Sequence, residues 1–496
     1  MRLRELVGPV GEVTVRGRLE GEITDLTDDS RRVRPGSLFV AVKGLQSDGH
    51  HHLEEAIKAG AAAVIVEAGR LSAEVAASFP VAVIEVEDSR RFLGVLAGRF
   101  YGDPSSRLTL IGVTGTNGKT TTTYLCKSVL EAGGAKVGLI GTVAYLIGNE
   151  RLTAAHTTPG ALELQALFKS MVDVGLDTAV MEVSSHALAL DRTAGCAFRT
   201  AVFTNLTQDH LDFHADMDEY FQTKLRLFRG LAAGGRAIVN LDDPYGERVV
   251  AASSAPVWTY ALDCPADLRA EDVHISLEGV QFTVRTPLGT VSLRSKLVGR
   301  HNVYNILGAV GVGIQQGVPL PAIASGVARL ANVPGRFERV EGGQAFTVVV
   351  DYAHTEDALY RLLTTAQAVR TGRIITVFGC GGDRDRGKRP KMGRVAALYS
   401  DVVVVTSDNP RTEDPVAIIR EVEPGVQAGL REAGKGRYVV LIDRRAAIAE
   451  AIRQARPGDL VLIAGKGHED YQTIGKEKQP FDDRVVAREA IKALSR

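Results

Sequence analysis

The chain alternates short apolar runs with amphipathic stretches, a pattern typical of α/β proteins. One apolar run, residues 108–113, leads into T-G-T-N-G-K and then four threonines. The run predicts a buried strand, and the residues after it predict a glycine-rich turn and a helix that begins at Lys119. This strand, loop and helix form the centre of the predicted architecture.

Three α/β regions are predicted: a small N-terminal domain at 1–103, a central P-loop-like, doubly wound domain at 104–333, and a Rossmann-like C-terminal domain at 334–496. Y-G-D-P-S-S and V-P-G-R-F-E, near the two boundaries, have the composition of connecting segments. The expected strands lie at 37–42, 62–67, 81–86, 108–113, 136–141, 178–183, 199–204, 236–240, 346–351, 374–379, 402–407, 438–443 and 460–464, with an antiparallel segment at 273–296 that turns at 286–289, and helices at 51–59, 160–174, 217–232 and 302–315.

Composition narrows the class of protein. Lys plus Arg and Asp plus Glu number 59 each among 496 residues, so no net charge attracts nucleic acid or an anionic membrane. The N-terminus lacks the apolar core of a signal peptide, and no segment supplies the ~20 apolar residues of a membrane-spanning helix. The four cysteines have no C-x-x-C spacing that would indicate a zinc site or a disulfide framework. We expect a cytoplasmic monomer that neither binds nucleic acid nor inserts into a membrane.

The loop before Lys119 predicts a nucleotide site. Its glycines let successive backbone N–H groups point into one hollow, where they and the helix N-terminus can hold a polyphosphate. Lys119 would neutralise charge on the terminal phosphates, and the hydroxyl of Thr120 or Thr121 would reach a Mg2+ ion. The loop is related to the P-loop without matching its strict spacing, and ATP is the expected ligand.

Polar residues follow the next strands of the same predicted sheet. Glu182 lies in M-E-V-S-S-H, at the end of one strand, and His210 lies in T-Q-D-H-L, after another. A carboxylate and an imidazole at these strand ends can converge on a phosphate-bound Mg2+. Lys224, on the predicted helix 217–232, cannot be told from a surface lysine by its own sequence context.

Two arginines lie in loops after strands of the C-terminal sheet. Arg389 belongs to G-C-G-G-D-R-D-R-G-K-R-P, and Arg411 belongs to S-D-N-P-R. In doubly wound sheets such loops are where ligands bind. Each arginine could therefore clamp a carboxylate in a bidentate pair.

Taken together, these motifs resemble the Mur ligase family of peptidoglycan synthesis over nearly the whole chain. Their order and spacing exclude coincidence. The matching segments are T-G-T-N-G-K-T-T at 114–121, H-T-T-P at 156–159, E-V-S-S-H-A-L at 182–188, T-N-L-T-Q-D-H-L-D-F-H at 204–214, H-N-V-Y-N at 301–305, P-G-R-F-E at 334–338, D-Y-A-H-T at 351–355, G-C-G-G-D-R-D at 379–385 and D-N-P-R at 408–411.

The resemblance implies a Mg2+-dependent ligase that uses ATP to join a carboxylate to an amine. The N-terminal domain would hold the UDP end of UDP-N-acetylmuramoyl-L-alanyl-D-glutamate, the central domain ATP, and the C-terminal domain the incoming amino acid. D-N-P-R favours meso-2,6-diaminopimelate, because its distal carboxylate calls for a fixed cation. The alternatives are a ligase that adds L-lysine, another Mur-type ligase, a folylpolyglutamate synthase, or a nucleotide-binding scaffold without chemistry.

The resemblance also assigns residues to each ligand. Lys224 would be carbamylated and would serve with Thr121, Glu182 and His210 as Mg2+ ligands; the expected catalytic residues are Lys119, Lys224, Glu182 and His210. The expected ATP contacts are Gly115, Thr116, Asn117, Gly118, Lys119, Thr120, Thr121, Asn302, Arg336 and Asp351. The expected contacts to the UDP-substrate are Ser30, Gly44, Leu45, Gln46 and Ser47 for its uridine nucleotide and Thr157, Thr158, Ser184 and Arg192 for its muramoyl-dipeptide. Those to the amino acid are Arg389, Asp408, Asn409, Pro410, Arg411, Gly465 and Glu469.

Overall fold

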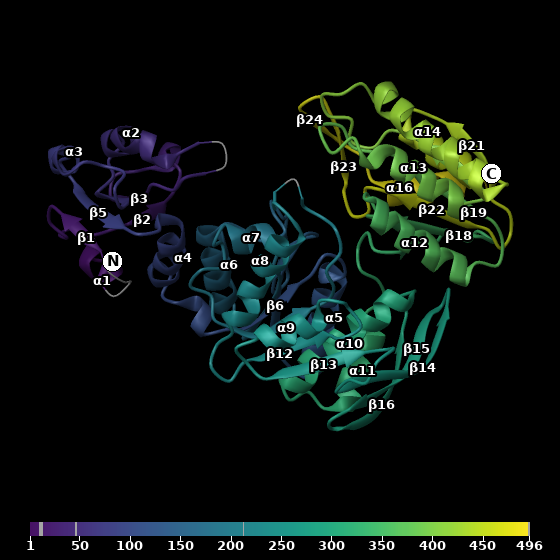
Figure 1. Ribbon diagram of the computed structural model, residues 1–496, viewed down its shortest axis with the longest axis horizontal. Coiled ribbons are helices and arrows are strands. Elements are labelled where there is room, and N and C mark those ends of the chain that lie inside the picture. The colour runs from purple at the N-terminus through teal and green to yellow at the C-terminus, as the bar shows by residue number, and fades with distance from the viewer. Residues whose placement is uncertain (9–12, 45–46, 212, 495–496) are drawn as a thin grey trace. The chain divides into compact units, whose positions relative to one another are not determined.

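The computed structural model describes residues 1–8, 13–44, 47–211 and 213–494. The chain divides into two compact units, one of residues 1–269 and 307–323, the other of residues 270–306 and 324–496. Parallel sheets flanked by helices confirm the predicted three-domain α/β class (Figure 1). The domain boundaries at 103 and 333 stay a prediction.

The N-terminal sheet has the strand order β1-β5-β4-β3-β2 and is parallel except for β1. Alternate side chains face opposite ways: Leu38 and Ile65 pack with α1 and α4, and Phe39 and Val64 pack with α2. The elements are β1 (Thr14–Arg16), β2 (Asp25–Thr27), β3 (Ser37–Val40), β4 (Ala63–Glu67) and β5 (Ala82–Val86), with α1 (Leu3–Val7), α2 (Leu53–Lys58), α3 (Ala73–Ser78) and α4 (Ser89–Phe100).

The central sheet has the order β16-β15-β14-β13-β12-β11-β6-β10-β7-β8-β9 and is parallel from β14 to β7. Strand β6 lies between β10 and β11, so their carboxyl ends meet at one edge. The strands are β6 (Thr109–Thr114), β7 (Val137–Ile140), β8 (Tyr145–Ile147), β9 (Glu150–Leu152), β10 (Thr178–Glu182), β11 (Phe198–Phe203), β12 (Arg236–Asn240), β13 (Val257–Ala261) and β14 (Leu268–Ser276).

The helices of this region begin and end close to their predicted positions. The predicted helix at 217–232 is α8, which ends at Arg229 before Gly230. The helices are α5 (Lys119–Ala132), α6 (Ala161–Asp173), α7 (Ser185–Ala189), α8 (Met217–Arg229), α9 (Gly246–Ala252), α10 (Arg300–Gln315) and α11 (Leu320–Arg329).

Strands β15 (Gly279–Thr286) and β16 (Gly289–Ser295) form the expected antiparallel hairpin. Its turn lies at the predicted residues, where the Thr286 hydroxyl donates to the Gly289 carbonyl oxygen at 2.8 Å. Gly289 has a φ of +119°, a value that favours glycine.

The C-terminal sheet has the order β17-β18-β22-β19-β20-β21 and is parallel except for β17. Val349 and Val403 pack with α12, α13 and α14, while Val350 and Val404 pack with α15 and α16, so the strands are apolar on both faces. The elements are β17 (Glu338–Arg339), β18 (Thr347–Asp351), α12 (Glu356–Val369), β19 (Ile374–Phe378), α13 (Lys388–Tyr399), β20 (Val402–Val405), α14 (Pro415–Ala433), β21 (Arg437–Val440), α15 (Arg444–Gln454), β22 (Leu460–Ala464), the hairpin β23 (Tyr471–Ile474) and β24 (Glu477–Pro480), and α16 (Asp483–Leu494).

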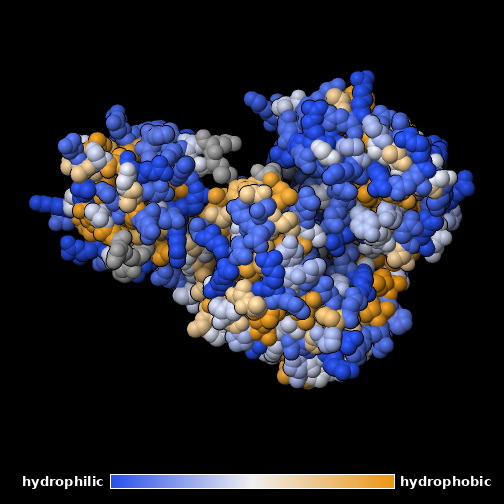
Figure 2. Space-filling view, viewed as in Figure 1, coloured by the Kyte–Doolittle hydropathy of each residue, from blue (hydrophilic) through white to orange (hydrophobic). Residues whose placement is uncertain are grey.

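The surface in Figure 2 is mostly hydrophilic, with hydrophobic residues in small groups. Within the part of the chain that the structure describes, no helix has the length and apolar character needed to cross a membrane.

Candidate active site

The loop after β6 has a shape that only glycine permits. Gly115 and Gly118 have φ values of +149° and +86°. A Cβ atom at Gly115 would overlap the hydroxyl of Thr204. Gly118 is the N-cap of α5 and adopts a left-handed conformation that favours glycine, so the loop passes directly into the N-terminus of the helix. These features are those of an anion-binding loop.

The loop is held from the side by the end of β11. Thr116 N–H donates to the Asn205 carbonyl oxygen, and Asn117 N–H donates to Asn205 Oδ1, each at 2.9 Å. The Thr204 hydroxyl donates to the Asn117 carbonyl oxygen at 2.6 Å. Sequence reasoning gave Thr204 and Asn205 no role, although T-N opens one of the matching segments. They position the loop.

Two lysines converge on this loop. Lys119 Nζ donates to the carbonyl oxygens of Gly115 at 2.9 Å and Thr116 at 2.7 Å, and Lys224 Nζ donates to that of Gly115 at 3.1 Å. Lys224 is only 2% exposed, so it is no surface lysine. Burial, and next the positive charge of Lys119, lower the pKa of Lys224 well below its ordinary value. A larger neutral fraction makes this amine nucleophilic.

Glu182 is the last residue of β10, and His210 lies in the segment after β11, which ends at Phe203. The buried Glu182 carboxylate accepts from Thr142 N–H at 2.8 Å and from the Thr142 hydroxyl at 3.1 Å. His210 is half-buried with a φ of +55°, and its ring lies 4.8 Å from that of His186. Thr142 is a further residue that sequence reasoning missed, because its loop carries no motif.

The predicted Mg2+ ligands have the chemistry that this ion prefers. Glu182 and Thr121 offer oxygen, His210 offers an imidazole, and a carbamate on Lys224 would add further oxygen. Over residues 1–8, 13–44, 47–211 and 213–494, no group of three or more His, Cys, Asp or Glu side chains could hold a metal ion alone. Phosphate oxygens would have to complete the coordination, so the metal site stays a prediction.

The four residues expected to contact the muramoyl-dipeptide form one cluster. Thr158 donates through its hydroxyl to the Glu182 carbonyl oxygen at 2.8 Å, and Ser184 N–H donates to Thr158 Oγ1 at 3.1 Å. Arg192 Nη1 donates to the Thr158 carbonyl oxygen at 2.8 Å. The hydroxyls of Thr157 and Thr142 lie 3.0 Å apart, which joins the cluster to Glu182.

The two loops expected to bind uridine nucleotide meet in the N-terminal domain. Ser30 Oγ donates to Glu55 Oε2 at 3.4 Å, the same oxygen lies 3.1 Å from His52 Nδ1, and His52 Nε2 lies 3.3 Å from Ser47 Oγ. Gly44 N–H donates to the Ser47 carbonyl oxygen at 2.8 Å and closes the second loop. Leu45 and Gln46 lie outside the described residues.

Three expected ATP contacts lie in the second unit. Asn302 is buried, and its side chain donates to the Val298 carbonyl oxygen at 2.8 Å. Asp351 accepts from Phe337 N–H at 2.7 Å; burial raises the pKa of this carboxyl, while the nearby Arg336 opposes the rise. Arg336 and Asp351 are therefore neighbours at the end of β18, and their contact with ATP stays a prediction.

Most of the expected amino-acid contacts come together beside β20 and β22. Asn409 Nδ2 donates to Glu469 Oε2 at 3.0 Å, and Gly465 has a φ of +118°, where a Cβ would press on Asp408 Oδ2 at 2.6 Å. Lys466, a buried residue that sequence reasoning missed, donates to Asn409 Oδ1 at 3.0 Å and to Glu469 Oε2 at 2.8 Å. These contacts build a polar site from D-N-P-R and G-K-G-H-E.

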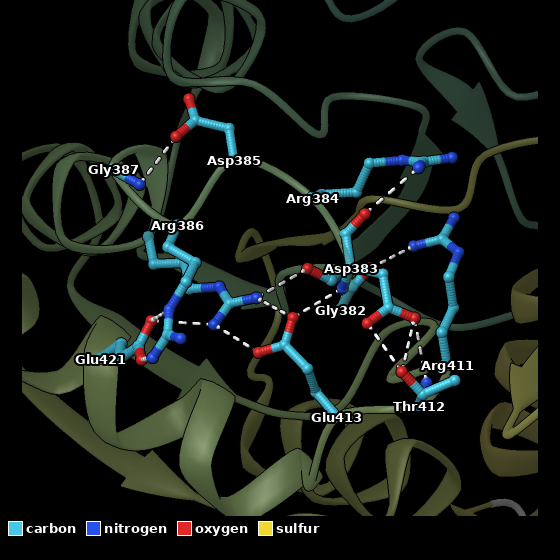
Figure 3. A network of polar contacts seen from close by, with 12 residues as sticks. Gly382, Asp383, Arg384, Asp385, Arg386, Gly387, Arg411, Thr412, Glu413 and Glu421 are labelled. Atoms are coloured by element: carbon cyan, nitrogen blue, oxygen red, sulfur yellow. Dashed lines mark hydrogen bonds and ion pairs between the residues drawn. The ribbon is translucent and has the colours of Figure 1, made fainter. Parts of the chain in front are cut away.

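Arg389 differs from the expectation that it offers a free guanidinium. It lies on α13 rather than in the loop and is 0% exposed. Its two Nη atoms bond the carboxylate of Glu413 at 2.8 and 2.9 Å, and Nη1 also bonds Glu421 at 2.8 Å. The carboxylates that pair with Arg389 are thus those of Glu413 and Glu421, and not that of a ligand. Two arginines on the loop are exposed: Arg386, which pairs with Glu421, and Arg384, which sequence reasoning did not select (Figure 3).

Arg384 and Arg411 lie on either side of one glycine. A Cβ at Gly381 would lie 3.0 Å from Arg411 Nη1 and 3.9 Å from Arg384 Cγ. Both side chains lie at the right of Figure 3, away from Glu421 at the left. Arg411 and Arg384 are therefore neighbours, whereas Arg389 is buried; which of them contacts the amino acid stays a prediction.

Comparison with known proteins agrees with this architecture. A model described as Mur ligase family, catalytic domain matches residues 22–101, the Mur ligase middle domain matches 113–313, and Mur ligase, glutamate ligase domain matches 335–467. The chain therefore belongs to the Mur ligase family.

Individual relatives extend over the whole chain. The protein of Geobacter metallireducens named UDP-N-acetylmuramoyl-L-alanyl-D-glutamate--2,6-diaminopimelate ligase is 47% identical and covers 100% of this chain and 99% of its own length. A protein of Gloeobacter violaceus with the same name is 48% identical, covering 99% of this chain and 98% of its own.

Solved structures show the same fold. A structure of a ligase with that name has a TM-score of 0.73 and 33% identity, covering 100% of this chain and 99% of its own. The MurF ligase of Thermotoga maritima, solved in complex with ADP, has a TM-score of 0.60 at 20% identity, and the match covers 95% of this chain and 96% of the MurF chain. The second likeness supports the fold alone.

Proposed function

We propose that this chain is a cytoplasmic, ATP-dependent ligase that adds meso-2,6-diaminopimelate to the D-glutamate γ-carboxylate of UDP-N-acetylmuramoyl-L-alanyl-D-glutamate, as a step of peptidoglycan synthesis. The observation that carries this proposal is the convergence of Lys119 and the buried Lys224 on a loop whose glycine at 115 admits no side chain. The names of its whole-length relatives support the choice of substrates.

The first half-reaction activates a carboxylate. An oxygen of the γ-carboxylate attacks the γ-phosphorus of ATP, ADP leaves, and an acyl phosphate forms. The loop N–H groups and Lys119 stabilise the negative charge of the transferring phosphoryl group, because they are already oriented before the reaction. Bound Mg2+ would neutralise further charge on the phosphates, held by Thr121, Glu182, His210 and a carbamate on Lys224.

The second half-reaction forms the amide. The amine of diaminopimelate attacks the acyl carbon, phosphate leaves, and the nitrogen loses a proton. Glu469, Asn409 and Lys466 form the polar wall of the site, and Glu469 can accept from the ammonium group at the distal centre.

Selection of the amino acid rests on fixed cations. Arg411 and Arg384 can pair with the distal carboxylate of diaminopimelate, which L-lysine lacks. A site built for a carboxylate leaves its guanidinium groups unpaired when lysine binds, and this penalises lysine. Arg389 supports the site indirectly, through its ion pair with Glu413.

The test is phosphate release and product analysis with purified protein, ATP, Mg2+ and the UDP-muramoyl-dipeptide, adding candidate amino acids one at a time. We expect phosphate release and a tripeptide nucleotide with meso-diaminopimelate and a far slower reaction with L-lysine. Equal efficiency with lysine would favour a lysine-adding ligase. Absence of any tripeptide nucleotide would overturn the proposal.

Carbamylation of Lys224 has a separate test. Protein equilibrated with 13C-bicarbonate should show one carbamate carbon signal that is absent from Lys224→Ala. The signal should weaken as the pH falls, because CO2 adds only to the neutral amine. A spectrum without this signal, in protein that is active and folded, would exclude a carbamate ligand.

A further inference from the structure

The guanidinium of Arg411 is held by a network that the proposed chemistry does not use. Arg411 has a φ of +51°, unusual for a residue with a side chain. Its N–H donates to the Thr473 carbonyl oxygen at 3.1 Å, and its own carbonyl oxygen accepts from Gly475 N–H at 2.8 Å. Its Nη1 donates to the Gly382 carbonyl oxygen at 2.7 Å. The direction of the side chain therefore depends on where Gly382 lies.

Gly382 is fixed in turn by the D-N-P-R segment. Its N–H donates to the Asn409 carbonyl oxygen at 2.9 Å, and a Cβ at this position would overlap the carbonyl of Pro410. The next residue, Asp383, accepts from Thr412 N–H at 3.1 Å and from the Thr412 hydroxyl at 2.8 and 3.0 Å (Figure 3). The loop that contains Gly382 and Asp383 is thus hydrogen-bonded to the D-N-P-R segment on both sides of Arg411.

Glu413 completes this closure. Its Oε1 accepts from Asp383 N–H at 2.6 Å, and its carboxylate takes both Nη atoms of Arg389. Arg389 is anchored independently by Glu421 and by the Gly381 carbonyl oxygen. Hydrogen bonding from Arg389 lowers the pKa of Glu413 to about 2, so the carboxylate stays charged at neutral pH. A buried cation on α13 therefore fixes the loop that aims Arg411.

We propose that Glu413 and Asp383 are positioning residues that set the direction of the Arg411 guanidinium and thereby determine recognition of the distal carboxylate of the incoming amino acid. The inference rests on the proposed function. Neither residue needs to touch the substrate. Both act through the Gly382 carbonyl, whose place decides whether Arg411 presents its fork to a carboxylate or turns away.

The experiment measures steady-state constants of the full chain for each substrate separately. Glu413→Gln keeps the size of the side chain but removes the charge that holds Arg389. We expect the KM for diaminopimelate to rise about tenfold, with kcat and the KM for ATP within about twofold of the parent, because only one binding contact is misdirected. The ratio of kcat/KM for diaminopimelate to that for L-lysine should fall by a similar factor.

The chain offers a matched control. Glu432 on α14 pairs with Arg394 on α13 at 2.8 and 2.9 Å, outside this network and on the surface. Glu432→Gln makes the same chemical change and should alter none of the constants. An equal effect of the two variants, or an equal rise of all three KM values in Glu413→Gln, would overturn the inference.

A second pair of variants avoids the buried cation. Thr412→Val removes the hydroxyl that donates to Asp383, and Thr412→Ser keeps it. We expect a rise in the KM for diaminopimelate with valine and recovery with serine. If valine and serine behave alike, the inference fails even where Glu413→Gln does not fold. Failure of the parent protein to make tripeptide nucleotide would instead count against the proposed function.

Discussion

The phosphate loop after β6 and the amino-acid site beside β20 are built in different ways. The loop is made of backbone: its shape depends on the positive φ of Gly115 and Gly118, and its partners are main-chain groups and the end of β11. The amino-acid site is made of charged side chains, which hold each other in chains of hydrogen bonds.

The difference decides what a sequence reveals. A backbone site needs glycine at fixed positions, so its motif identifies its residues one by one. A side-chain network requires only that opposite charges pair. A loop motif can contain several arginines, and the sequence does not show which of them the packing will bury. The phosphate loop should therefore be sensitive to added atoms, and the amino-acid site to altered charge.

The largest effect is expected for Lys119→Ala. It removes the cation nearest the phosphate loop, and kcat should fall about a thousandfold or more, since a preoriented charge is lost from the transition state. The fold should be unchanged by circular dichroism. Lys127→Ala, further along α5 and paired with Glu131, is the control and should keep most of the activity. Near-normal turnover of folded Lys119→Ala would contradict the assignment.

Gly115→Ala tests the backbone character of the loop. The added Cβ would overlap the Thr204 hydroxyl at a φ of +149°, so we expect kcat/KM for ATP to fall about a hundredfold through misplacement of the loop. Gly134→Ala is the comparison. Gly134 has a φ of +95°, and a Cβ added there would have no atom within 4 Å, so this variant carries backbone strain without a clash. A similar loss in both variants would show that strain, not contact, governs the effect.

Arg384, on the loop after β19, and Arg389, on α13, should be distinguished by their effects on stability. Arg384→Ala should raise the KM for diaminopimelate about tenfold with an unchanged unfolding midpoint, since one exposed cation is removed. Arg389→Met should lower the free energy of unfolding by about 2 kcal/mol, because Glu413 and Glu421 lose their partner, and should raise the KM for diaminopimelate only indirectly, because Glu413 no longer has the cation that holds it. Steady-state kinetics and thermal unfolding of both proteins check this. If Arg389→Met raised the KM without loss of stability, and Arg384→Ala lowered stability without raising the KM, Arg389 would again be the expected ligand contact.

Much of the fold was predictable because its core strands are apolar. Parallel strands buried on both faces give unbroken apolar runs, such as Leu460–Ala464. Two of the missed strands lack this signal. Strand β9 (Glu150–Leu152) is exposed throughout, and β23 (Tyr471–Ile474) is half-exposed, so hydrophobicity cannot mark them.

Within the site, prediction of a residue's position succeeded best at a strand end, while the roles of the residues stay predictions. Glu182 is the last residue of β10, which lies beside β6, and His210 lies in the segment that follows β11. It failed for Arg389 because α13 begins at Lys388, one residue before it, and turns its side chain inward toward α14. The motif contains three arginines, and the carboxylates that neutralise Arg389 lie 24 and 32 residues further along the chain. Such partners emerge only from packing.

The smallest effect concerns acid. Arg389 lowers the pKa of Glu413 from 4.5 to about 2, so the stabilisation by this carboxylate is complete above pH 4.5 and is lost as the pH falls toward about 2. The reporter is the Asp383 amide, which donates to Glu413 at 2.6 Å. Between these pH values its hydrogen-exchange protection, corrected for intrinsic rates, should fall several-fold in the parent and stay nearly constant in Glu413→Gln.

The phosphate loop supplies the internal comparison for that measurement. Its Asn117 amide donates at 2.9 Å to the amide oxygen of Asn205, which does not titrate, and residues 114–119 contain no acidic side chain. Protection at Asn117 should therefore stay constant where protection at Asp383 falls. A parallel loss at both amides would mean that acid opens the protein as a whole, and that charge does not distinguish the two sites.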